Sequence, residues 1–189
     1  MTILVMAQVF PPAHGGSGRW LWELYRRLPG IRVVVAAGHA PGAELFDAAS
    51  PLPIHRIKLA FPTWGLPEPR GAAHYLRALL TLRRIVRQVR PDVIHCGKCL
   101  PEGLLAAAFK RWGGLPFSCF VHGEELTLAG TSRELNRLTR SVLRQASTVI
   151  ANSHHTRQML VEHWDVVEDE ASQAESKSGS PMFGDRFPV

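Results

Sequence analysis

Short apolar runs alternate with amphipathic stretches along most of the chain. Each apolar run ends at a glycine, a proline or a polar cluster, which predicts a buried strand. The predicted strands cover residues 2–9, 31–37, 54–59, 92–95, 117–121 and 148–151. Strands that are apolar on both faces and alternate with helices are typical of a parallel sheet covered on two sides. The pattern therefore predicts an α/β fold with one doubly wound parallel sheet.

Helical spacing of apolar residues predicts helices between and after these strands. The predicted helices cover residues 19–28, 72–90, 103–110, 132–145 and 153–163. Residues 72–90 carry the clearest pattern, with five arginines largely off the apolar face. The positions expected on that apolar face are Leu76, Leu79, Ile85, Val86 and Val89.

Two regions depart from this alternation. Residues 39–70 contain six prolines and predict a long, stiff connection whose one regular element is the strand at 54–59. Beyond Trp164 the chain becomes acidic and serine-rich with few large apolar residues, so it cannot bury enough surface to order itself. We therefore expect a folded domain over residues 1–164 and a disordered tail over residues 165–189.

Composition and charge narrow the kinds of partner. The 189 residues, 46% hydrophobic and 20% charged, suit one globular domain. The net charge of +6 is uneven, because residues 1–161 carry +11 and residues 162–189 carry −5. A basic body favours phosphorylated small molecules or acidic membrane surfaces. Nucleic acid is not expected as a partner, because the basic residues are scattered and match no RNA- or DNA-binding motif.

The chain also predicts a cytoplasmic location. Its apolar runs fall short of the roughly 18 residues needed to span a bilayer. Residues 2–10 lack a basic n-region and a cleavage site and run into prolines, so they predict a first strand rather than a signal peptide. The three cysteines, Cys96, Cys99 and Cys119, cannot all pair with one another, which fits a reducing compartment better than a disulfide scaffold.

Polar clusters follow four of the predicted strands, at the edge where open α/β sheets bind ligands. After the first strand, Gly15 and Gly16 precede Arg19, and glycines there let backbone N–H groups approach a phosphate at a helix N-terminus. Any one cluster is compatible with a structural role, but four at one edge predict a functional cleft. The other clusters contain His95, Lys98, Glu102, His122, Glu124, Glu125, Asn152 and Ser153.

A zinc site is an alternative use of part of this region. The pairs Cys96/Cys99 and Cys119/His122 have the ligand types and spacings of such a site. However, residues three apart in a strand point to opposite faces, so Cys119 and His122 should not converge on one ion. A redox role for Cys96 and Cys99 is weaker still, because no helix begins at the first cysteine. We expect no metal.

The order and spacing of several motifs resemble the N-terminal half of family 4 glycosyltransferases, which have the GT-B fold. The resemblance runs from about residue 2 to residue 164. Members of that family have two Rossmann-like domains, of which the N-terminal one mainly receives the acceptor and the C-terminal one binds the nucleotide-sugar donor. The motifs are Phe10-Pro11-Pro12, Gly15-Gly16, the RPDVIH segment 90–95, Pro101-Glu102-Gly103, the HGEE segment 122–125 and the IANS segment 150–153.

The resemblance implies roles for several residues. Gly15 and Gly16 would lie against the donor diphosphate or the acceptor, and His122 would contact the transferred sugar near its reacting carbon. Arg19 and Lys98 are candidates for pairing with a phosphate, from charge alone. The residues implied on the acceptor side are Glu102, Glu124, Glu125 and Asn152.

The sequence lacks the second Rossmann domain and its paired-glutamate motif. We therefore expect the acceptor-binding half of a retaining hexosyltransferase, either truncated or completed by a partner chain, and inactive by itself. The acceptor would be a sugar or a lipid-linked sugar, and the arginines of residues 72–90 could hold the protein at the inner face of an anionic membrane. The alternative is a non-catalytic module that binds a phosphorylated or glycan ligand.

Overall fold

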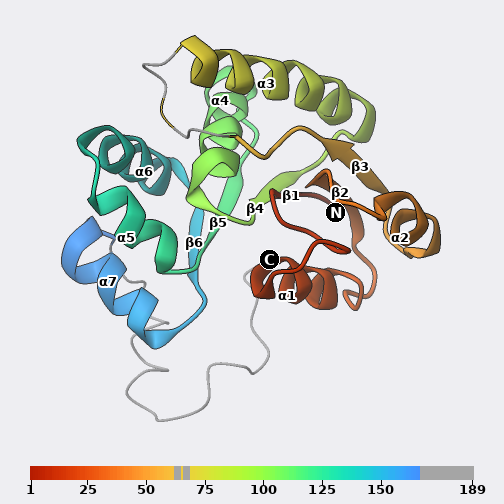
Figure 1. Ribbon diagram of the computed structural model, residues 1–189, viewed down its shortest axis with the longest axis horizontal. Coiled ribbons are helices and arrows are strands. Elements are labelled where there is room, and N and C mark those ends of the chain that lie inside the picture. The colour runs from red at the N-terminus through yellow and green to blue at the C-terminus, as the bar shows by residue number, and fades with distance from the viewer. Residues whose placement is uncertain (62–64, 66–68, 167–189) are drawn as a thin grey trace.

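The computed structural model describes residues 1–61, 65 and 69–166. Within these residues, six strands form one parallel sheet in the order β3-β2-β1-β4-β5-β6 (Figure 1). All six strands predicted from the sequence are confirmed, with ends shifted by a few residues. The strands are β1 (Thr2–Ala7), β2 (Arg32–Gly38), β3 (Ile54–Ile57), β4 (Val93–Cys96), β5 (Phe117–Val121) and β6 (Thr148–Ala151).

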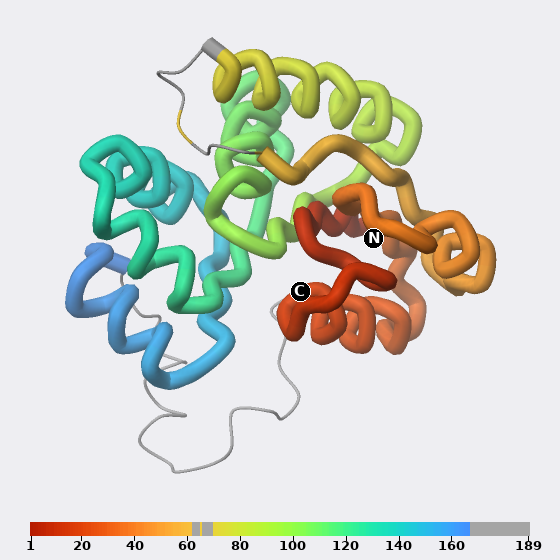
Figure 2. The backbone as a smooth tube through the Cα atoms, in the orientation of Figure 1, coloured from red at the N-terminus to blue at the C-terminus, as the bar shows by residue number. Residues whose placement is uncertain are grey.

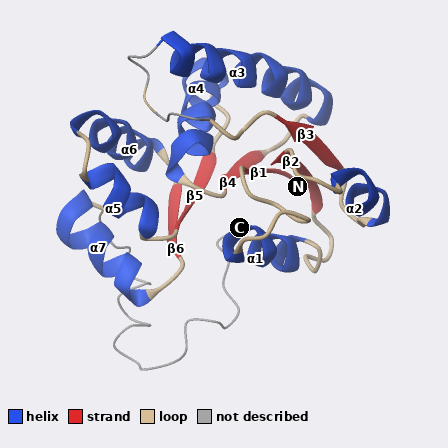
Figure 3. Ribbon diagram, viewed as in Figure 1, coloured by secondary structure: helices blue, strands red, loops and turns tan. Residues whose placement is uncertain are grey.

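Helices cover both faces of the sheet, as Figures 2 and 3 show. The first helices, α1 (Gly16–Tyr25) and α2 (Ala43–Ala49), pack on one face. The other described helices pack into the core of the opposite face. These are α3 (Pro69–Val89), α4 (Leu104–Gly113), α5 (Glu124–Gly130), α6 (Arg133–Gln145) and α7 (His154–Trp164), with a short π-helical turn, η1 (Cys99–Gly103), before α4.

The apolar strands form because both of their faces are buried. In β1, Ile3 and Val5 belong to the core beneath α1 and α2, whereas Leu4 and Met6 belong to the opposite core. Successive residues of a strand point to opposite faces, so an unbroken apolar run fills both cores at once. The doubly wound α/β fold expected from the sequence is confirmed.

The strand order creates a switch point between β1 and β4. From β1 the chain first builds outward through β2 to β3, and it then returns to the other side of β1 to add β4, β5 and β6. At such a point the loops after the two central strands diverge and leave a crevice at their carboxyl ends. The loop with Gly15 and Gly16 follows β1, and Lys98 and Glu102 follow β4.

Two helices were missed in the sequence analysis. Helix α2 lies in the proline-rich connection, and it buries only Ala43 while Leu45 is 82% exposed, so it has no clear apolar period. Helix α5 comes directly after the HGEE motif and has seven residues. Both are too short to complete the repeating pattern by which a longer helix is recognised.

The longest helix, α3, differs in one respect from the pattern proposed for it. Leu79, Ile85, Val86 and Val89 lie in or against the core, but Leu76 is 57% exposed. Leu80 on the next turn is 52% exposed. The solvent face of α3 therefore carries leucines as well as arginines.

The end of the described chain continues the fold past Trp164. Asp165 pairs with Arg140 at 2.5 Å, and Val166 packs against the core. The rest of the predicted tail, residues 167–189, lies outside the described residues.

Candidate functional site

A pocket of about 440 Å³ opens at the carboxyl ends of β4 and β5. Its walls come from the loop after β4, from the residue that follows β5 and from α5. Four of the predicted site residues meet there, although they are up to 27 positions apart in sequence. The lining residues are Lys98, His122, Glu124, Glu125, Thr127, Leu128 and Thr131.

His122 is half-buried at the pocket wall with one ring nitrogen fixed. Its Nε2 lies 3.0 Å from the carbonyl oxygen of Gly97. A carbonyl oxygen can only accept, so Nε2 carries the proton and, in the neutral ring, Nδ1 presents a lone pair. Burial lowers the pKa of His122 below its usual value; the hydrogen bond to Gly97 opposes this shift, and nearby Lys98 adds to it. The ring is therefore a neutral hydrogen-bond acceptor near pH 7.

Glu125 is a buried carboxyl on the same wall. Its side chain is at the start of α5, and the residue is 6% exposed. Oε2 accepts the backbone N–H of Cys99 at 3.2 Å, and Oε1 has no hydrogen-bond partner in the described structure. Burial, with a contribution from Glu102, raises the pKa of Glu125 to about 8. A buried carboxyl with an unpartnered oxygen beside a pocket is a candidate ligand contact.

Glu102 lies behind this wall rather than on it. It is 1% exposed, and its Oε1 accepts the backbone N–H of Gln8 at 2.6 Å. Burial raises the pKa of Glu102 to about 7, against the opposing effect of the Gln8 N–H and of Lys98. Glu102 therefore ties the residue that follows β1 to the turn that follows β4, across the switch point.

Gly15, Gly16 and Arg19 lie at the exposed N-terminus of α1. Gly15 is the residue before the helix, and its carbonyl accepts the N–H of Arg19 at 3.2 Å. The first turn contains no acidic residue and no side chain caps it. Free N–H groups and a positive helix end without a countercharge favour an anion at this position.

Three predicted residues are used elsewhere in the fold. His95 points to the α1 layer, where its Nδ1 lies 2.5 Å from the Tyr25 hydroxyl, and burial lowers its pKa to about 4. Ser153 caps α7 by accepting the N–H of Thr156 at 3.2 Å. Asn152 Oδ1 accepts the Thr156 hydroxyl at 2.8 Å. The structure therefore does not bring these three side chains to the pocket.

The cysteines lie in the core rather than at the pocket. Cys96, Cys99 and Cys119 are all buried, and the sulfurs of Cys99 and Cys119 are 3.6 Å apart. The hydrogen bond with Cys119 and burial raise the pKa of Cys99, so its reactive thiolate form is disfavoured. His122 is committed to Gly97 instead. In the part of the chain described, no three His, Cys, Asp or Glu side chains are grouped as metal ligands.

Three of the lining residues were not predicted from the sequence: Thr127, Leu128 and Thr131. All three belong to α5 or directly follow it, and that helix was not recognised. The usable signal was present: two glutamates after Gly123, in the first turn, and Gly130 at the end fit a short helix. Once the helix is placed, Glu124, Thr127, Leu128 and Thr131 follow on one face by their spacing of three and four residues.

A family model and a curated relative both match this chain in sequence. A family model described as Glycosyltransferase Family 4 matches residues 14–172. The chain is 29% identical over 127 residues to a GDP-mannose-dependent alpha-(1-6)-phosphatidylinositol monomannoside mannosyltransferase of Mycobacterium tuberculosis. That match covers 66% of this chain and 31% of the relative, so the chain spans about a third of the relative's length.

Solved structures share the fold at low sequence identity. A protein from Anabaena, crystallised with UDP and glucose, has a TM-score of 0.61 at 16% identity, and the match covers 94% of this chain and 50% of that one. A sucrose-phosphate synthase from Thermosynechococcus elongatus has a TM-score of 0.62 at 15% identity, covering 86% and 45%. The chain therefore has the fold of about half of each of these proteins.

Proposed function

The chain belongs to glycosyltransferase family 4, and we propose that it is the acceptor-binding half of an enzyme that transfers a sugar from a nucleotide-sugar donor. It has the fold of one GT-B domain. Members of this family have a second domain that binds the donor. We therefore propose that such a domain completes the enzyme, either in the same polypeptide or in another one. The nucleotide-sugar is the substrate, and the proposal needs no metal or further cofactor.

One observation carries this proposal: the pocket beside β4 and β5 gathers a neutral histidine, a lysine and a buried carboxyl. His122 Nδ1 can accept a sugar hydroxyl. The Glu125 carboxyl lies at the same wall, and its buried Oε1, which has no hydrogen-bond partner in the described residues, would reach a second hydroxyl when a ligand draws the side chain into the pocket. Thr127 and Thr131 add hydroxyl groups, and Lys98 adds a cation for a phosphate. Several polar groups converging on one concave site suit a polyhydroxylated ligand.

The N-terminus of α1 would stabilise the leaving group of the transfer reaction. When the bond between the sugar and the diphosphate breaks, negative charge develops on the leaving phosphate. The N–H groups from Gly16 onward and the Arg19 guanidinium would stabilise that charge. His122 would hold the sugar so that its reacting carbon faces the acceptor, which lowers the entropy cost of the encounter.

The acceptor class follows from the relative and from α3. The mycobacterial relative is named for a phosphatidylinositol monomannoside, which combines a sugar, a phosphate and a lipid. Helix α3 has five arginines and no acidic residue, and Leu76 and Leu80 are exposed on it. None of the described helices has the length and apolar character needed to cross a bilayer. We propose a sugar or lipid-linked acceptor, reached from the cytoplasmic side of an anionic membrane.

Replacing His122 by alanine is expected to remove transfer while leaving the fold intact. The binding assay uses a glycerophosphoinositol monomannoside, which is the water-soluble head group of the acceptor for which the relative is named. By calorimetry, His122→Ala should bind this head group about as tightly as the wild type does, because His122 is assigned to the transferred sugar and not to the acceptor. In a chimera with the donor domain of the relative, the same change should lower kcat by about 100-fold.

His163→Ala is the matched control, because that side chain is 67% exposed on α7 and lies outside the pocket. It should behave as the wild type in both assays. Unchanged transfer by His122→Ala in the chimera would refute the role of His122. A wild-type chimera that folds and binds the head group but transfers no sugar would favour the alternative, in which this chain is a non-catalytic binding module.

Reversing two charges on α3 is expected to release the protein from anionic membranes. Arg77 and Arg84 are exposed on the same helix as Leu76 and Leu80. Each arginine near an anionic surface contributes about 1 kcal/mol, so Arg77→Glu with Arg84→Glu should weaken vesicle binding by at least about tenfold. Sedimentation with phosphatidylglycerol-rich vesicles at low salt measures this, and added salt should have the same effect.

The control changes the net charge equally on another helix. Arg133→Glu with Arg137→Glu alters two exposed arginines of α6 and should leave most of the vesicle binding in place. Equal loss in both double variants would mean that net charge, not α3, drives binding. No sedimentation of the wild type at low salt would refute the membrane proposal.

A further inference from the structure

Arg56 lies at the centre of the contacts that hold the loop between β1 and α1. This loop, residues 8–15, is called the glycine loop below, and it leads into the N-terminus of α1. We propose that Arg56 is a positioning residue: through the Pro11 carbonyl it fixes the glycine loop, and thereby sets where Gly15 and Gly16 meet a diphosphate. The second part rests on the proposed function.

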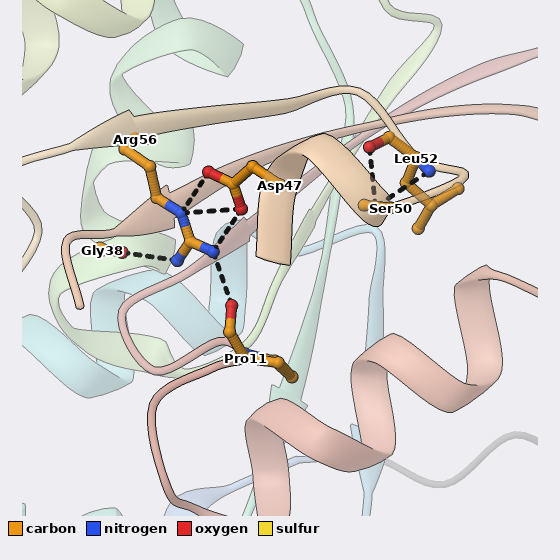
Figure 4. Close-up of polar contacts among 6 residues, drawn as sticks. All are labelled: Pro11, Gly38, Asp47, Ser50, Leu52 and Arg56. Carbon is orange, nitrogen blue, oxygen red and sulfur yellow. Dashed lines mark hydrogen bonds and ion pairs between the residues drawn. The ribbon is translucent and has the colours of Figure 1, made fainter. Parts of the chain in front are cut away.

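The guanidinium of Arg56 uses its N–H groups on three different segments (Figure 4). Nε and Nη2 donate to the Asp47 carboxylate of α2, at 2.9 and 2.6 Å. Nη1 donates to the carbonyl of Gly38 at the end of β2, at 2.8 Å. Nη2 also donates to the carbonyl of Pro11 in the glycine loop, at 2.5 Å. The Arg56 side chain is only 10% exposed.

The contact with Asp47 prepares Arg56 to hold the loop. A bidentate carboxylate fixes the plane of the guanidinium and balances its charge in a nearly dry site. The turn after α2 supports this geometry, because Ser50 Oγ donates to the Leu52 carbonyl at 2.9 Å and accepts the Leu52 N–H at 3.0 Å (Figure 4). The remaining N–H groups are then aimed at the two carbonyls.

The glycine loop has few other anchors at this point. Its first residue, Gln8, donates to Glu102, and Gly38 allows a close approach to Gln8: a Cβ on Gly38 would lie 2.1 Å from the Gln8 carbonyl oxygen. Phe10 is fully buried. The segment from Pro11 to Gly15 begins at the buried Pro11. Within the described residues, its hydrogen bonds are the one from Arg56, the turn from Ala13 N–H to the Phe10 carbonyl at 3.2 Å and, at its helical end, the Arg19 N–H to the Gly15 carbonyl. Loss of Arg56 should therefore free the half of the loop that leads to Gly15.

Lysine cannot replace Arg56 in this role. An ammonium is a point charge on a flexible stem, whereas the planar guanidinium reaches a carboxylate and two carbonyls at fixed angles. Arg56→Lys keeps the charge near Asp47 but is expected to give up the bond to Pro11. Asp47→Asn is a milder change, because it keeps Arg56 and both carbonyl contacts while loosening the plane of the guanidinium.

The test is an NMR titration of the ¹⁵N-labelled chain with inorganic diphosphate, far below the melting temperature of each variant. The wild type should show saturable shifts at Gly15 and Gly16. Arg56→Lys should weaken diphosphate binding by about tenfold, and Asp47→Asn by about threefold. Arg32→Lys, at an exposed position at the start of β2, is the matched control and should bind as the wild type does.

A purely structural role would have a different outcome. Arg56→Lys would then lower the melting temperature, but the folded variant would bind diphosphate as tightly as the wild type, and the proposal would be overturned. As a second variant, Arg56→Ala should regain diphosphate affinity when millimolar ethylguanidinium is added, because ethylguanidinium can occupy the position that the Arg56 side chain has left. Failure of this rescue in a folded variant would also count against the proposal.

Amide hydrogen exchange separates this proposal from the function on which it rests. If the wild type binds no diphosphate, the proposed role of Gly15 and Gly16 fails, yet exchange still tests Arg56. In Arg56→Lys the amide of Ala13, whose N–H donates to the Phe10 carbonyl, should then exchange at least about tenfold faster, with β5 unchanged. Equal exchange in both proteins would overturn the role of Arg56, whatever diphosphate does.

Discussion

Replacing Gly18 by alanine is expected to lower the free energy of unfolding by at least about 3 kcal/mol. A Cβ on Gly18 would lie 2.4 Å from the carbonyl oxygen of Val9 and 3.1 Å from the Cα of Phe10. Both atoms belong to the backbone, so no flexible side chain can move away to make room. To relieve the overlap, α1 would have to separate from the loop after β1, which would open the core around Leu21.

Gly16→Ala is the matched control, two residues earlier in the same helix. A Cβ there meets nothing within 4 Å, and alanine is a better helix former than glycine, so this variant should gain about 0.5 kcal/mol. Urea denaturation followed by circular dichroism measures both effects. The free energy of unfolding should therefore fall in Gly18→Ala and rise in Gly16→Ala. Similar stability of the two variants would contradict the close packing of α1 on this loop.

The sheet could be predicted from the sequence because its central strands are apolar on both faces, as in β1 and β2. The edge strand β3 (IHRI) and the half-buried β6 carry a weaker signal, and they were recognised from their place in the alternation of strands and helices. The same logic located the pocket, since residues directly after parallel strands share one edge of the sheet. Lys98 and His122 lie at the pocket for this reason.

The orientation of individual side chains could not be predicted in the same way. His95 also lies at a strand end, but the alternation of β4 turns it to the α1 layer and Tyr25, on the other side of the sheet from its neighbour Cys96. The contact between Arg56 and Asp47 depends on α2, whose single buried residue leaves no periodic signal. Short helices are held by tertiary contacts, which one sequence does not reveal.

Replacing Glu125 by glutamine is expected to stabilise the protein at alkaline pH. The folded-state pKa of Glu125 is about 8, raised by burial, whereas an exposed glutamate titrates near pH 4.3. Between these values the folded state holds a proton that the unfolded state has lost, so the wild type loses stability as the pH rises from about 4.3 to about 8, and the loss is complete above pH 8. Glutamine has no proton to lose, so Glu125→Gln should be more stable than the wild type at pH 9 by up to about 4 kcal/mol.

The neighbours of Glu125 determine how large this effect is. Lys98 favours the ionised form, Glu102 opposes it, and the Cys99 N–H partly compensates the charge. Glutamine can still accept that N–H through its oxygen, so the difference at pH 5 should be small. Melting curves at pH 5, 7 and 9 test this, with Glu124→Gln as control because that side chain is exposed on the same helix turn. A gain that does not change with pH would contradict the raised pKa of Glu125.

Glu125→Gln should also weaken binding of the head group, although it makes the fold more stable at alkaline pH. The Glu125 carboxyl lies at the pocket wall, its ionisation destabilises the fold near neutral pH, and its buried Oε1 lacks a hydrogen-bond partner in the described residues. Such a group is expected where a ligand draws the carboxyl into the pocket and completes its hydrogen bonding. Glutamine places an amide N–H₂ or a weaker acceptor at that position, so head-group affinity should fall by about tenfold while the melting temperature at pH 9 rises. Calorimetry on the same samples measures both changes. If stability increased with no loss of affinity, Glu125 would be a buried carboxyl without a role in the pocket.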